Sequence, residues 1–234
     1  MSAQAPASSK ISSRPRQLAL ALDHAESFAR EDFLSGGGNA AALALIDSWP
    51  DWPSRAVALI GPEGSGKTHL ATIWAAAAGA RVVSGKQIGA LDLPGMLATG
   101  ALVIEDAGAP TDERALFHVL NLAREEQAYV LITTRLLPSA FEIELRDLRS
   151  RLRALPVVAL REPDDQLFRA LIIKYCADRQ MAVDETVVSY LSSRIERSYA
   201  AARQAVALLD TEALRQGRPV TRALAAELLR TPPS

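Results

Sequence analysis

The sequence is poor in cysteine, in aromatic residues and in net charge. One cysteine among 234 residues excludes an internal disulfide framework and leaves Cys176 as a small apolar residue in a helical pattern. Aromatic residues make up 5% of the chain and do not alternate with basic ones, so the pattern does not favour stacking on nucleic-acid bases. The formal net charge of −1 gives no overall attraction to nucleic acid or to an anionic membrane.

Long apolar runs are also absent. No stretch approaches the length of a membrane span, and the Ser, Ala, Pro and Arg-rich start lacks the apolar core of a secretion signal, so we expect a cytoplasmic protein. His24, His69 and His118 show no spacing typical of metal ligands. A composition of 49% hydrophobic and 23% charged residues is typical of a folded protein with one or two domains.

The most informative motif is a glycine-rich phosphate-binding loop between an apolar run at 56–60 and an amphipathic segment at 69–78. Its residues are Gly61, Pro62, Glu63, Gly64, Ser65, Gly66, Lys67 and Thr68. Glycines let backbone N–H groups approach phosphates, Lys67 can neutralise phosphate oxygens, and Thr68 can ligate Mg²⁺. The motif predicts binding of ATP or ADP, and the alternative is a glycine-rich turn with a chance lysine.

Short apolar runs alternate with helical patterns over most of the chain. The strand candidates are 56–60, 81–84, 101–105, 129–133 and 157–160, which predicts an α/β fold with a parallel sheet flanked by helices. After the helix-start signal at 162–165, the pattern is helical throughout. We therefore expect a flexible segment at 1–24, a nucleotide-binding α/β domain at 25–161 and a small all-helical domain at 162–234.

The predicted strand at 101–105 ends in two carboxylates. Glu105 and Asp106 would lie at the sheet edge that carries the phosphate loop, where one acid could hold Mg²⁺ through water and the other could orient an attacking water. The order Glu then Asp is unusual, because an Asp is expected first. A longer side chain there would displace the metal or the water, so we expect weak intrinsic ATP hydrolysis.

Several segments together resemble the AAA+ module of the DnaA family of bacterial replication initiators, and specifically its Hda branch, whose members inactivate DnaA. The segments are Gly-Pro-Glu-Gly-Ser-Gly-Lys-Thr-His-Leu at 61–70, Leu-Val-Ile-Glu-Asp at 102–106, Leu-Ile-Thr-Thr at 131–134 and Leu-Arg-Ser-Arg-Leu at 148–152. The resemblance implies a P-loop AAA+ core followed by a helical lid at 162–234. It also adds His69 to the residues near the nucleotide.

The resemblance assigns roles to three polar residues. Arg151 falls on the arginine finger, which reaches a nucleotide held by a neighbouring subunit, whereas the charge run at 146–153 alone favours a solvated basic face. Thr133 and Thr134 resemble the sensor that contacts a γ-phosphate or an attacking water, although threonine is also an ordinary strand residue. These roles are implied by the family and not by spacing.

The sequence departs from the family in the predicted lid. Ala200 stands where the family places a second sensor arginine, and Arg203, one turn later, is the nearest substitute. If Arg203 cannot reach, discrimination between ATP and ADP weakens or favours ADP. The segments at 27–28, 32–34 and 36–39 resemble the stretch over the adenine base in this family. Phe28, Phe33 or Leu34 would supply apolar contacts to the base, and these residues could equally belong to the core. The initiators' helical insertion and DNA-binding domain are not expected here.

A second partner motif precedes the predicted core. Gln17, Leu18, Leu20 and Leu22 resemble the Gln-Leu-x-Leu-x-Leu peptide with which Hda proteins dock on the sliding clamp of DNA polymerase III. The leucines would fill an apolar pocket and the Gln17 amide would fix the register. The alternative is a first helix of the core, because Ala and Leu are strong helix formers.

The sequence is compatible with three classes of function. The favoured one is a nucleotide-bound adaptor that docks on the clamp, reaches DNA only through it, and stimulates hydrolysis by DnaA through Arg151. The second is a stand-alone AAA+ ATPase acting on nucleic acid, such as a helicase loader or a DnaA paralogue. The third is a nucleotide-gated scaffold. A homodimer is conceivable, and the resting nucleotide, ADP or ATP, is left open.

Overall fold

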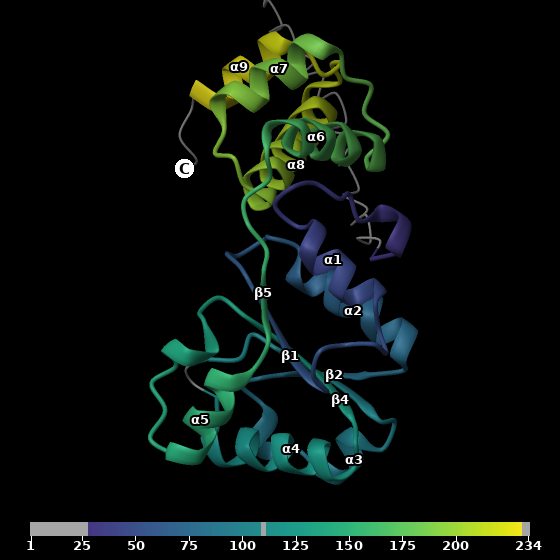
Figure 1. Ribbon diagram of the computed structural model, residues 1–234. Coiled ribbons are helices and arrows are strands. Elements are labelled where there is room, and N and C mark those ends of the chain that lie inside the picture. The colour runs from purple at the N-terminus through teal and green to yellow at the C-terminus, as the bar shows by residue number, and fades with distance from the viewer. Residues whose placement is uncertain (1–27, 109–110, 231–234) are drawn as a thin grey trace, which may run out of the picture.

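The computed structural model describes residues 28–108 and 111–230 (Figure 1). The clamp motif at 17–22 therefore lies outside the described residues. The described chain contains a five-stranded sheet in the order β2-β3-β4-β1-β5, and every neighbouring pair is parallel. The strands are β1 (Ala56–Ile60), β2 (Arg81–Ser84), β3 (Ala101–Glu105), β4 (Tyr129–Thr134) and β5 (Val157–Ala159).

Helices cover both faces of the sheet (Figure 1). One face carries α1 (Ala40–Asp47) and α2 (Lys67–Ala78), and the other carries α3 (Leu93–Leu97), α4 (Glu113–Glu125) and α5 (Arg146–Ala154). Short 3₁₀ helices occur at η1 (Arg30–Asp32), η2 (Ile88–Ala90) and η3 (Pro138–Ala140). This is the parallel sheet between two helical layers that the sequence predicts.

Strand residues alternate between the two helical layers. On β1, Val57 and Leu59 join the core beneath α1 and α2, while Ala58 joins the core beneath α4. All three are fully buried, which explains why the strand is a continuous apolar run. Trp74 on α2 stacks on Trp52 at a centroid distance of 4.8 Å and anchors the first layer.

A bundle of four helices follows the sheet. The helices are α6 (Asp165–Asp178), α7 (Glu185–Arg194), α8 (Tyr199–Gln216) and α9 (Arg222–Arg230). Side-chain caps begin three of them, because Asp164, Asp184 and Ser198 each accept a hydrogen bond from a first-turn backbone N–H. The bundle has its own apolar core, which includes Phe168, Ile172 and the fully buried Cys176.

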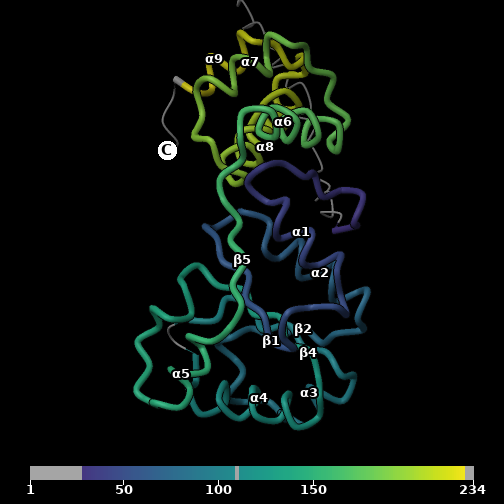
Figure 2. Tube along the Cα trace, in the orientation of Figure 1, coloured from purple at the N-terminus to yellow at the C-terminus, as the bar shows by residue number. Residues whose placement is uncertain are grey.

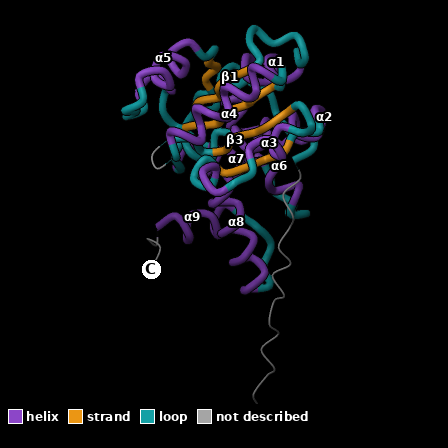
Figure 3. The backbone as a smooth tube through the Cα atoms, turned by 90° about the horizontal axis from the view of Figure 1, so that it is seen from below, coloured by secondary structure: helices purple, strands orange, loops and turns teal. Residues whose placement is uncertain are grey.

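A single segment joins the α/β part to the helical bundle. After α5 the chain passes through β5 and continues directly into α6 (Figure 2). In the view turned by 90°, α8 and α9 lie outside the outline of the sheet (Figure 3), and Figure 1 shows the bundle on the same side of the sheet as α1 and α2. No helix of the described residues is long and apolar enough to cross a membrane. Burial raises the pKa of the Cys176 thiol to about 11, as expected for an inert core thiol.

The predicted elements are confirmed with small shifts at their ends. Strand β4 extends one residue further than predicted, to Thr134, and β5 stops one residue earlier, at Ala159. The helix after the glycine-rich loop begins at Lys67, within the loop motif itself.

Candidate nucleotide-binding site

The glycine-rich loop connects β1 to the start of α2 at the carboxyl edge of the sheet. The backbone N–H of Gly61 donates to the carbonyl oxygen of Thr134 at 3.2 Å, which joins the loop to the end of β4. A Cβ at residue 61 would lie 2.7 Å from Oγ of Ser65 and 2.8 Å from the carbonyl oxygen of Leu160. Only glycine fits at this first position of the loop.

Lys67 lies inside the loop and is 6% exposed. Its Nζ donates hydrogen bonds to the carbonyl oxygens of Gly61 at 2.9 Å and Pro62 at 2.8 Å. Burial lowers the pKa of the Lys67 ammonium below its usual range, and the charges of Asp106 and Glu105 partly oppose that shift. The loop therefore contains a desolvated cation close to both acids at the end of β3.

Two buried oxygens test whether this site suits a phosphate group with a hydrated cation. Within the described residues, Oγ of Ser65 and Oε1 of Glu105 are buried side-chain atoms without a hydrogen-bond partner. Buried polar atoms are usually satisfied, so these two indicate a place for a polar ligand. The hydroxyl can donate to a phosphate oxygen, and the carboxylate can accept from a metal-bound water. The chemistry of the site fits a nucleotide with Mg²⁺, which Thr68, Glu105 and Asp106 would hold.

The predicted sensor threonines both end β4 and are 1% exposed. Oγ1 of Thr133 accepts a hydrogen bond from the backbone N–H of Asp106 at 3.1 Å. Asp106 has a φ of 49°, a left-handed conformation uncommon for a non-glycine residue, and this contact supports it. The hydroxyl of Thr134 bonds both backbone groups of Leu136 and closes the turn after the strand. Thr133 thus connects the strand end to the acidic pair.

A charged pair lies across the loop. Nη1 of Arg135, the residue after β4, is 2.9 Å from Oε2 of Glu63 in the loop. The charge of Arg135 also contributes to lowering the pKa of Lys67, after the larger effect of burial. Arg135 is therefore close enough to act on the same part of the site as the loop lysine.

The bundle closes over the loop at Gly64. This residue has a φ of 70°, and a Cβ there would lie 2.8 Å from Cβ of Ala200, the second residue of α8. The structure therefore places Ala200 against the loop, without a cation at that point of contact. Arg203 lies one turn further along α8 and lines a cavity between the loop and the bundle. Its guanidinium is 5.7 Å from the ring centre of Tyr175.

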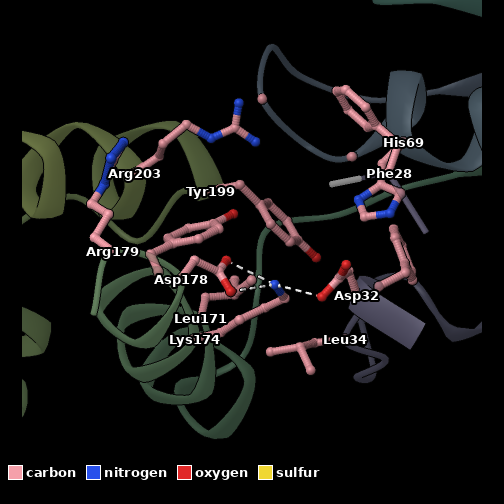
Figure 4. A pocket seen from close by; sticks show the side chains of 14 residues that line it. Phe28, Asp32, Leu34, His69, Leu171, Lys174, Asp178, Arg179, Tyr199 and Arg203 are labelled. Carbon is pink, nitrogen blue, oxygen red and sulfur yellow. Dashed lines mark hydrogen bonds and ion pairs between the residues drawn. The ribbon is translucent and has the colours of Figure 1, made fainter. Parts of the chain in front are cut away.

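A cavity of about 280 Å³ lies between the loop and the bundle (Figure 4). The predicted base-contact residues Phe28, Phe33 and Leu34 line it, together with His69. The His69 ring makes edge contacts with both phenylalanines, at centroid distances of 5.3 and 5.2 Å. Its Nε2 lies 3.0 Å from the carbonyl oxygen of Ala29. The apolar wall and the adjoining loop have the size and lining expected for a base and its phosphates.

Two sets of contacts, one in the cavity and one beside it, were not predicted from the sequence. Lys174 of α6 forms ion pairs with Asp32 at 2.9 Å and Asp178 at 2.8 Å, and so ties the segment before α1 to the bundle (Figure 4). Asn39 is 1% exposed, accepts from the N–H of Gly36, and donates to the hydroxyl of Tyr199 at 3.1 Å. Only the Gly-Gly-Gly-Asn run at 36–39 signals this tight turn beforehand.

The buried phenol of Tyr199 leads to a pH prediction. Burial raises its pKa to about 12, against 10.0 for an exposed tyrosine. The unfolded chain therefore loses this proton first, so the contribution to stability is complete below pH 10 and is lost as pH rises toward 12. We expect Tyr199→Phe to lose less stability than the wild type between these values, measured as the free energy of unfolding in urea. An identical alkaline slope in both proteins would contradict the assignment.

Arg151 lies elsewhere. It is half-buried on α5, and its guanidinium sits 5.1 Å from the ring centre of Phe117 on α4. Arg151 does not line the cavity. The other three arginines of the helix, Arg146, Arg149 and Arg153, are exposed. The interpretation as a solvated basic face therefore describes those three residues, and Arg151 differs from them by its contact with an aromatic ring.

The glycine-rich loop between β1 and α2, the parallel sheet between two helical layers and the helical bundle after it together form a P-loop fold. No protein-family model and no curated protein matches the sequence. Among solved structures, the chain is similar to domain III of the Thermotoga maritima replication initiation protein DnaA. The TM-score is 0.72 at 21% identity, over 87% of this chain and 95% of that one.

Two further structures are similar. One is the replication initiator DnaA bound to AMPPCP and single-stranded DNA, with a TM-score of 0.64 and 17% identity over 81% of this chain and 68% of that one. The other is a variant of Thermotoga maritima RuvB, with a TM-score of 0.62 and 15% identity over 82% of this chain and 67% of that one. At these identities the likeness shows a DnaA-like AAA+ fold.

Proposed function

We propose that this protein is a nucleotide-bound regulator that stimulates ATP hydrolysis by DnaA. The observation that carries the proposal is the position of Arg151, which lies on α5 outside the cavity that the chain's own loop lines. A guanidinium in that position serves a nucleotide held by another subunit. The DnaA-like fold makes DnaA itself the partner that we propose.

The chain's own cleft would hold ADP or ATP with Mg²⁺. The loop residues from Gly61 to Thr68 would cradle the phosphates, while Phe28, Phe33, Leu34 and His69 would contact the base. The bound nucleotide neutralises Lys67 and supplies the phosphate oxygens that complete the Mg²⁺ shell. A similar structure, DnaA bound to AMPPCP, supports this assignment.

We further propose that the chain hydrolyses its own nucleotide slowly. The first acid of the pair at the end of β3 is a glutamate, Glu105, and Ala200 presents no charge where α8 meets the loop. Fewer charges are then available to stabilise the transferring phosphoryl group. The protein would act as an activator and keep its nucleotide as a structural ligand of the cleft.

Gln17 tests the adaptor part of the proposal. We expect immobilised sliding clamp to retain the wild-type protein and to lose Gln17→Ala, because the amide fixes the register of the peptide whose leucines fill the clamp pocket. Gln4→Ala, in the same N-terminal segment, is the matched control. Equal retention of Gln17→Ala and wild type would reject docking through residues 17–22.

The second candidate is an ATPase that acts directly on nucleic acid. The similar DnaA structure that contains single-stranded DNA favours it, whereas the net charge of −1 opposes it. Affinity for single-stranded DNA at physiological salt, measured by fluorescence anisotropy without a partner, separates the two. Micromolar or tighter binding would support this candidate, and no binding would support the regulator.

A further inference from the structure

The ion pair between Glu63 and Arg135 lies at the phosphate end of the proposed cleft. Glu63 is in the glycine-rich loop, and Arg135 follows Thr134, whose carbonyl oxygen accepts from Gly61. The pair therefore spans the two segments that border the position of Lys67. In a P-loop, the lysine reaches the β- and γ-phosphates, so this is the end where a diphosphate and a triphosphate differ.

The two charges can exchange partners. The side chains of Arg135 and Glu63 are 57% and 74% exposed, and an exposed pair of this kind contributes only about 0–1 kcal/mol. Hydrogen bonds between arginine and phosphate are charge-assisted and stronger than neutral ones. A terminal phosphate would therefore compete successfully with Glu63 for the guanidinium.

The opposite side of the loop offers no cation at the corresponding contact. Ala200 packs against Gly64, where a longer basic side chain could otherwise reach the phosphates from α8. Arg203, one turn further along α8, lines the cavity with its guanidinium 5.7 Å from the ring centre of Tyr175. The additional charge of a triphosphate would then be met mainly from the sheet edge. Arg135 is the arginine at that edge whose charge already acts on Lys67.

We propose that Arg135 recognises the terminal phosphate of a bound nucleoside triphosphate, and that Glu63 competes for the same guanidinium. The ion pair thereby sets the preference of this chain between diphosphate and triphosphate. With a diphosphate, Arg135 stays on Glu63. With a triphosphate, Arg135 moves to the phosphate and leaves the Glu63 carboxylate in solvent. This proposal rests on nucleotide binding as set out under the proposed function.

Calorimetric affinities for ADP and for the β,γ-methylene analogue of ATP test it. We expect Arg135→Gln to weaken analogue binding about tenfold, the effect of losing one charge-assisted contact, and to change ADP binding less than about twofold. Arg135→Lys keeps the charge but lacks the planar guanidinium, so its affinity for the analogue should lie between those of the wild type and Arg135→Gln. Arg81→Gln changes an exposed arginine at the start of edge strand β2 and should match the wild type.

Glu63→Gln should change the affinity for the ATP analogue in the opposite direction. Removing the competing carboxylate should strengthen analogue binding about threefold, since an exposed pair is weak, and this gain should disappear in the Glu63→Gln, Arg135→Gln double variant. Equal weakening of both nucleotides by Arg135→Gln, or none, would overturn the assignment while leaving the proposed function intact. A wild-type chain that bound neither nucleotide would overturn both. Loss of DnaA stimulation or clamp docking would affect only the proposed function.

Discussion

Replacing Arg151 by alanine is expected to reduce the stimulated rate of ATP hydrolysis by DnaA about a thousandfold, the lower range for an arginine finger. The guanidinium stabilises charge on the transferring phosphoryl group, and no neighbouring side chain on α5 offers a comparable group from the same position. The protein's own affinity for ADP should stay unchanged, because Arg151 does not line its cavity. Single-turnover hydrolysis by DnaA-ATP, with clamp-loaded DNA present, measures the effect.

Arg153→Ala is the matched control for this prediction. Arg153 is exposed two residues further along α5, so its loss removes one charge from the same helix without the contact to Phe117. Arg153→Ala should retain most of the stimulation. Phe117→Leu should reduce it moderately, because the ring holds the Arg151 side chain in place. Full stimulation by Arg151→Ala would remove the basis of the proposed mechanism. A loss of stimulation supports the mechanism when the urea midpoint of the variant matches that of the wild type.

The sheet could be predicted because its strands are buried on both faces. Residues 56–60 and 101–104 are unbroken apolar runs, and the structure shows them packed between two helical layers. Their ends were less predictable. Thr134 continues β4 because its hydroxyl bonds the backbone of Leu136, and that contact depends on a turn which propensity does not encode.

The candidate site could be predicted only where its residues are consecutive. The loop at 61–68 and the acids at 105–106 are local patterns, and the structure brings them together at one sheet edge. Contacts across long separations gave no local signal. Asn39 and Tyr199 are 160 residues apart, and the pairing of Lys174 with Asp32 joins two elements whose approach depends on the whole fold. The resemblance, not spacing, identified Ala200 as a position of interest.

The effect of Lys67→Met should appear chiefly when nucleotide is present. Without nucleotide, the substitution removes a buried charge but leaves the carbonyl groups of Gly61 and Pro62 without their donor. These effects oppose each other, so the free energy of unfolding should change little. With ADP and Mg²⁺ at a thousand times the dissociation constant, the wild type should gain about 4 kcal/mol, and Lys67→Met should gain less than about 1 kcal/mol.

Lys86→Met is the control, because Lys86 is an exposed lysine after β2 and its replacement should leave the nucleotide-dependent gain intact.

The pH dependence of the free energy of unfolding gives an independent check. Burial lowers the pKa of Lys67 below 10.5, so between the pKa of the folded state and pH 10.5 the unfolded chain binds more protons than the folded one. Without nucleotide, the wild type should therefore become more stable relative to Lys67→Met as pH rises toward 10.5. A gain with ADP as large in Lys67→Met as in the wild type would exclude the glycine-rich loop as the phosphate site.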